Sequence, residues 1–130
     1  MKNKKIHLDK LKEISQNIDN PKYNKENALE VLKHLINTSN NEKIRIDAIK
    51  LLIGLKLKNH IIFKILEKCL LSDESYSVRG LCAKYLLLMY PNKCRDSIKW
   101  TLRHDTSPIV LKIIKDLSFG MDGHKLEMLR

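Results

Sequence analysis

The chain has 130 residues, a formal net charge of +10, 43% hydrophobic residues and 31% charged residues, which is the composition of one ordinary globular domain. Its four glycines and three prolines are too few for a turn-dense β-sandwich or a low-complexity chain, so an all-α fold is favoured. No apolar run reaches the roughly 18 residues of a membrane span, and the basic N-terminus lacks a signal-peptide core. We therefore expect a cytoplasmic protein with no membrane partner.

Apolar residues recur at spacings of three and four along most of the chain, the pattern of amphipathic helices. Together with the turn signals between them, these runs predict helices at about 6–18, 25–37, 42–54, 60–71, 75–90, 93–104 and 108–119. Since a single amphipathic helix is unstable in isolation, neighbouring helices are expected to pack their apolar stripes against each other.

Capping residues support these boundaries. Several first turns are expected to be capped by the side-chain oxygen of an asparagine, namely Asn24, Asn59 and Asn92. Ser107 followed by Pro108 predicts a cap and then a proline at the first helical position. Gly54 and Gly120 stand where glycines commonly end helices.

Three stretches of the chain can be written over one another. Leu32, Leu66 and Ile98 share one position, at offsets of 34 and 32 residues, and the same offsets relate Ile44, Val78 and Val110. Recurrence at this period indicates helical-hairpin repeats. We expect one domain over 1–130, with repeats at about 24–57, 58–91 and 92–119, an N-terminal helix within 1–23, and a cap or partial repeat at 120–130.

The second repeat carries a family resemblance. Its residues Asp73, Val78, Arg79, Cys82, Ala83 and Leu86 resemble the pattern D-x-x-x-x-V-R-x-x-A-x-x-L of HEAT-like repeats. The third repeat keeps Asp105 but has Leu111 in place of the arginine, and the first keeps Arg45 but has Ser39 in place of the aspartate. The stretch 24–119 is thus similar to the PBS-lyase-type HEAT, or armadillo-like, family. This resemblance implies a right-handed α-α superhelix.

The aspartate and the arginine of this pattern have a physical role at a helical hairpin. Each turn leaves unpaired backbone groups, and an aspartate at the turn with an arginine in the next helix can bond those groups and each other. We therefore interpret Asp73, Arg79, Asp105 and Arg45 as structural residues first, and as partner contacts second.

Catalytic and metal-binding patterns are lacking in the sequence. The histidines, His7, His34, His60, His104 and His124, are scattered, and Cys69, Cys82 and Cys94 form no metal knuckle or redox pair. The four glycines cannot build a phosphate-binding loop. We therefore expect no enzyme, no catalytic residue, no metal and no cofactor, with free thiols in a reducing compartment.

One enzymatic alternative comes from the resemblance, because HEAT-like repeats also build DNA glycosylases of the alkylation-repair type. Such an activity implies an aromatic residue that holds a nucleotide and an acid beside it, for which the chain offers Trp100 and Asp116. Trp100 adjoins Leu102 in the apolar pattern of its helix, so core or inter-repeat packing is its favoured role.

A binding function is favoured over catalysis. In HEAT-like solenoids the second helices line the concave face, and here they supply a basic strip consisting of Arg45, Lys50, Arg79, Lys84, Lys112 and Lys115. We expect this strip to bind an acidic protein or peptide surface. Nucleic acid is the alternative, since Coulomb attraction does not separate the two. Uncovered terminal repeats also predict self-association.

Overall fold

The computed structural model describes residues 2–119, which contain helices and no strand. The chain divides into two compact units, residues 1–62 and 63–130. The prediction of an all-α fold is confirmed for the described residues. The helix-ending role of Gly120 and the cap or partial repeat at 120–130 lie outside them. None of the described helices is long and apolar enough to cross a membrane.

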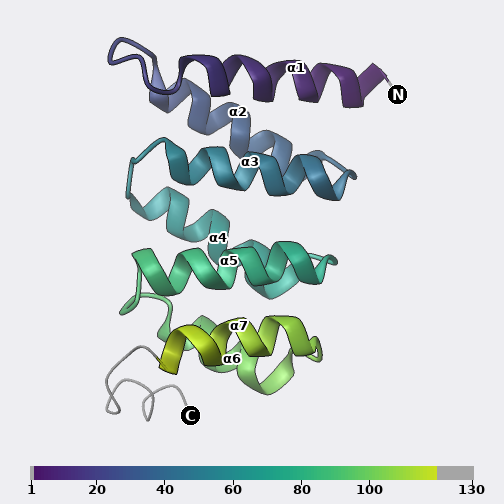
Figure 1. The fold of residues 1–130 in the computed structure, drawn as a ribbon, viewed down its shortest axis with the longest axis vertical. Helices are drawn as coiled ribbons and strands as arrows, with labels where there is room; N and C mark the ends of the chain where they lie inside the picture. The colour runs from purple at the N-terminus through teal and green to yellow at the C-terminus, as the bar shows by residue number, and fades with distance from the viewer. Residues whose placement is uncertain (1, 120–130) are drawn as a thin grey trace. The chain divides into compact units, whose positions relative to one another are not determined.

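The first unit contains α1 (Lys2–Asn17), α2 (Lys25–Thr38) and α3 (Glu42–Gly54). Within it α1 contacts both other helices, and α2 pairs with α3. Figure 1 shows α1 and α3 in one layer and α2 behind them. The apolar stripes predicted from the sequence are buried, with Leu32 and Leu35 of α2 and Ile49 and Leu52 of α3 fully inaccessible. Burial of each such side chain contributes roughly 1.5–3 kcal/mol.

The second unit contains α5 (Tyr76–Met89), α6 (Arg95–His104), α7 (Pro108–Phe119) and, from Phe63 onward, α4 (His60–Ser72). Helices α5 and α7 lie side by side, and α6 packs on α7. The rings of Phe63 and Tyr90 meet edge to face, with centroids 5.5 Å apart, and join the beginning of α4 to the end of α5.

Most predicted helix caps are present. The side chains of Asn24 and Asn59 accept hydrogen bonds from the backbone N–H groups of Asn27 and Ile62. The prediction for Asn92 was wrong, because residues 91–94 form a turn and α6 begins only at Arg95. A cap-like residue after a proline therefore did not mark the helix start here.

Two glycines allow close packing of helices. Helix α3 ends at Gly54 as predicted, but the left-handed backbone conformation after it belongs to Lys56, with φ of 57°. A Cβ atom at Gly54 would lie 3.2 Å from Cδ1 of Ile18, and one at Gly80 would lie only 2.8 Å from Cδ1 of Ile113. Gly80 thus permits the close approach of α5 and α7.

Candidate partner-binding surface

Three helical hairpins share one turn conformation, at residues 39–45, 73–79 and 105–111. In each turn the first side chain accepts a hydrogen bond from the backbone N–H two residues later, in the pairs Ser39–Asn41 (3.1 Å), Asp73–Ser75 (2.9 Å) and Asp105–Ser107 (2.9 Å). The third residue then caps the next helix, in the pairs Asn41–Ile44, Ser75–Val78 and Ser107–Val110. These bonds satisfy backbone groups that the hairpin leaves open.

The arginine of the repeat pattern completes two of these turns. Nη1 of Arg79 donates to the carbonyl oxygen of Asp73 at 2.9 Å, and Nη1 of Arg45 donates to the carbonyl oxygen of Ser39 at 3.0 Å. In both pairs the arginine follows the carbonyl by six residues. Ser39 therefore accepts in the first turn the same hydrogen bond that aspartate accepts in the other two. In the sequence, the serine differs from the aspartate of the repeat pattern.

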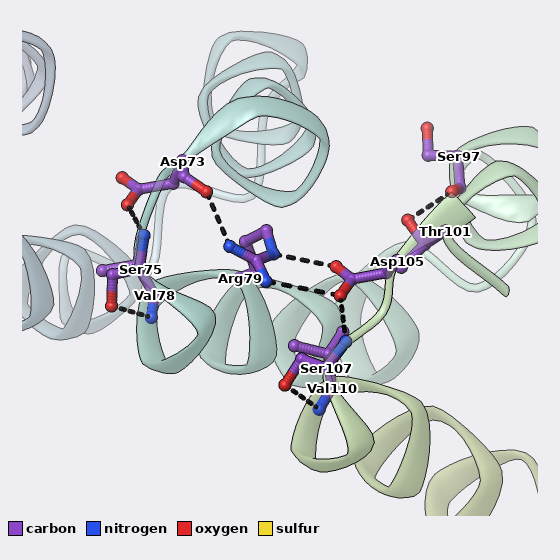
Figure 2. Close-up of polar contacts among 9 residues, drawn as sticks. All are labelled: Asp73, Ser75, Val78, Arg79, Ser97, Thr101, Asp105, Ser107 and Val110. Carbon is purple, nitrogen blue, oxygen red and sulfur yellow. Dashed lines mark hydrogen bonds and ion pairs between the residues drawn. The ribbon is translucent and has the colours of Figure 1, made fainter.

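Arg79 also joins two successive turns of the second unit. Figure 2 shows its guanidinium between Asp73 and Asp105. Its Nε and Nη2 donate to Oδ2 and Oδ1 of Asp105, at 2.8 and 3.3 Å. The side chains are only 18% and 5% exposed. A shielded two-point ion pair of this kind is among the stronger polar contacts in proteins.

The ion pair changes the acidity of Asp105. Burial by itself would raise its pKa, but hydrogen bonds from Arg79 and from the Ser107 N–H, with the charge of the guanidinium, outweigh burial and lower the pKa below its ordinary value. The charged carboxylate is thus the form that the fold stabilises.

We expect Asp105→Asn to destabilise the protein at neutral pH and to matter less in acid. A carboxyl whose pKa is lowered by folding contributes its stabilisation above its ordinary pKa, and that stabilisation is lost as the pH falls through the folded pKa. Urea unfolding of both proteins between pH 7 and pH 2.5 measures this difference. It should shrink below about pH 4, whereas the exposed Asp96→Asn should show no such trend.

Two of the predicted contact residues are taken up by the fold itself. Arg45 is buried, with 5% of its surface exposed, and Arg79 is held by Asp73 and Asp105. The assignment of Arg45 to a partner-binding surface is therefore corrected, because its guanidinium bonds a turn carbonyl in a buried setting. Arg79 has the structural role that was its first interpretation.

The four predicted lysines are exposed. Lys50 lies on α3 in the first unit, and Lys84 on α5 and Lys112 and Lys115 on α7 lie on neighbouring helices of the second unit. Nζ of Lys112 lies 2.8 Å from Oδ2 of Asp116, but both side chains are mostly solvated and such a pair is weak. The structure thus brings three of the predicted site residues, Lys84, Lys112 and Lys115, onto one pair of helices.

The prediction that Trp100 packs in the core was wrong. Its side chain is 47% exposed rather than packed in a core, and its ring lies 4.6 Å from that of His104 between centroids. The buried side of α6 is formed by Ser97, Ile98 and Thr101. Trp100 therefore points outward, which the apolar pattern of the sequence did not indicate.

A polar contact between α4 and α6 was also missed. The hydroxyl of Ser97 donates to the carboxylate of Glu67, which also lies 3.4 Å from Nζ of Lys64. Thr101 donates its hydroxyl to the carbonyl oxygen of Ser97 at 2.8 Å. Serine and threonine on the buried side of a helix were the available signal, since buried hydroxyls need partners.

Two of the three cysteines, Cys82 and Cys94, have thiols with a raised pKa. All three are buried, and none of them forms a disulfide with another described residue. A hydrogen bond with Cys69, together with burial, raises the pKa of the Cys82 thiol, and burial raises that of Cys94 to about 11. Thiols with raised pKa are poor nucleophiles and metal ligands at neutral pH. Among residues 2–119 no group of three or more histidine, cysteine or acidic side chains is placed to hold a metal ion.

Comparison with protein-family models, curated proteins and solved structures gives no match for this chain.

Proposed function

We propose that this protein is a non-enzymatic HEAT-like repeat module that binds an acidic protein surface through α5 and α7. The observation that carries the proposal is the mixture of exposed side chains on these neighbouring helices. On α5, Leu88 is 59% exposed and follows Lys84 by four residues; on α7, Ile109 is 49% exposed and precedes Lys112 by three. Residues at these spacings share a helix face.

This mixture favours a protein partner over a nucleic acid. A phosphate backbone would satisfy the lysines but would offer no partner to exposed aliphatic side chains. A protein surface satisfies both, because interfaces combine an apolar centre with charge complementarity at the edge. Lysine is also a point charge without the planar, bidentate geometry that arginine brings to phosphate and base recognition.

We also propose that the chain is a HEAT-like superhelix. Two observations support this fold: the shared turn bonding recurs at offsets of 34 and 32 residues, and the second helices of two successive hairpins, α5 and α7, lie side by side within the second unit. Their common polar positions then compose the ligand-facing strip of a solenoid.

Selection of peptides tests the proposed function. A phage library of random 12-residue peptides is panned on the wild-type protein, and the enriched peptides are synthesised. We expect them to combine Asp or Glu with a large aliphatic residue, and to bind the double variant Lys84→Glu, Lys112→Glu at least tenfold more weakly. The matched control, Lys10→Glu with Lys33→Glu, changes the net charge equally at exposed positions of α1 and α2 and should bind normally.

The nucleic-acid alternative is measured in the same series. Labelled single-stranded and duplex DNA and RNA are titrated at several salt concentrations. Micromolar binding that falls steeply with salt and is lost in the Lys84→Glu, Lys112→Glu variant would contradict the proposal, because it would show that the lysines neutralise phosphates.

A further inference from the structure

A small pocket lies in the second unit between the ends of α4 and α6. Its volume is about 220 Å³, below the range of pockets that enclose whole drug-sized ligands. Leu71 and Trp100 supply its apolar lining, and His104, Thr106 and the Arg79–Asp105 ion pair supply polar atoms. The pocket therefore has the size and character to receive one side chain rather than a metabolite.

The aromatic lining of this pocket is available to a ligand. Trp100 and Leu71 are 47% and 36% exposed, and the indole N–H of Trp100 and the ring nitrogens of His104 make no hydrogen bond to any other residue in 2–119. Tryptophan is enriched among the residues that dominate protein–protein binding energy.

The unmatched charge beside the pocket is mainly positive. Lys68 precedes Leu71 by three residues on α4, and Arg103 follows Trp100 by three on α6; both are exposed and neither has an ion-pair partner in the described part of the chain. The carboxylate of Asp105 is neutralised by Arg79. Asp96, four residues before Trp100, is the exposed acid on that side of α6.

We propose that this pocket docks a peptide segment of a protein partner, which places one large apolar side chain against Trp100 and Leu71 and an acidic residue beside Lys68 or Arg103. The aliphatic side chain of Leu71 in the lining favours an apolar peptide side chain over a phosphate backbone. The site shares with the proposed function only the assumption of a protein ligand, since neither Lys84 of α5 nor Lys112 of α7 lines it.

The chain's single tryptophan makes the test direct. Peptides of 12 residues are selected from a phage library on the wild-type protein, with counter-selection on Trp100→Ser, and the recovered sequences are titrated while the Trp100 emission is followed. We expect recovered peptides to carry a large apolar residue flanked by Asp or Glu and to change the emission on binding. Their affinity should fall at least tenfold for Trp100→Ser and for the double variant Lys68→Glu, Arg103→Glu, and less than threefold for Trp100→Phe.

Further variants separate the two sites. Thermal unfolding should be unchanged in Trp100→Ser, because the side chain is half exposed, so loss of binding is not loss of fold. If all peptides selected without the counter-selection bind Trp100→Ser normally but fail on Lys84→Glu, Lys112→Glu, the result would support the α5–α7 surface and overturn the pocket. The reverse pattern would support the pocket and leave the α5–α7 lysines without a role. The pocket proposal would be overturned if no peptide is enriched on the wild-type protein relative to Trp100→Ser. It would also be overturned if single-stranded DNA or RNA changes the Trp100 emission and none of the peptides does.

Discussion

Arg79→Ala is expected to lower the free energy of unfolding by about 3 kcal/mol. The substitution removes three hydrogen bonds, two to the Asp105 carboxylate and one to the Asp73 carbonyl oxygen. It also leaves Asp105, whose side chain is 5% exposed, as a charge without its partner, which costs more than the lost bonds alone. Urea denaturation monitored by circular dichroism measures the change.

Two controls show whether this loss comes from the contacts of Arg79 or from the removal of any arginine. Arg103→Ala removes an exposed arginine without an ion-pair partner among residues 2–119 and should change stability by less than about 0.5 kcal/mol. Arg79→Lys keeps the charge but not the two-point geometry and should recover only part of the loss. If Arg79→Ala lowers the free energy of unfolding no more than Arg103→Ala does, the ion pair does not stabilise the second unit.

Gly80→Leu is expected to destabilise the protein by about 2–3 kcal/mol. A Cβ atom at this position already comes within 2.8 Å of Cδ1 of Ile113, so a leucine must force α5 and α7 apart or adopt a strained rotamer. Since α5 and α7 carry Lys84 and Lys112, the same variant should also weaken binding of any ligand that contacts both helices. Denaturant unfolding and peptide titration measure the two effects.

Gly80→Ala is the matched control for this substitution. The atom it approaches is the far end of the flexible Ile113 side chain, which can rotate away, and alanine gains roughly 0.5–1 kcal/mol over glycine inside a helix. The alanine variant should therefore be close to wild type in stability. A large loss of stability in Gly80→Ala would mean that the Ile113 side chain cannot move. Unchanged stability in Gly80→Leu would show that α5 and α7 are not closely packed.

Helix positions followed from the sequence because local rules decide them. Apolar spacing and capping side chains marked α2, α3, α4, α5 and α7 within a residue at each end, whereas α1 begins at Lys2, four residues before its predicted start. The start of α6 was misjudged because Asn92 follows Pro91 in a turn, where the capping preference of asparagine and its turn preference coincide. Local sequence cannot separate the two.

The candidate sites depended on information that helical periodicity does not contain. The exposure of the lysines of α5 and α7 could be predicted because they occupy polar positions of predicted helices. Arg45 was misassigned because the partner of a long side chain is set by the folded turn, here the Ser39 carbonyl. Trp100 was misassigned because hydrophobicity alone suggested burial, whereas the hydroxyls of Ser97 and Thr101 occupy the buried side.

The ion pair of Arg79 and Asp105 has a consequence for recognition. Both residues line the pocket beside Trp100, and Asp105 is further fixed by the N–H of Ser107. These two lining residues are thus already ordered in the free protein, so their side chains lose little conformational entropy on binding. The pocket would therefore act as a preformed binding site that does not need to fold around its ligand. Short peptides would then suffice as ligands.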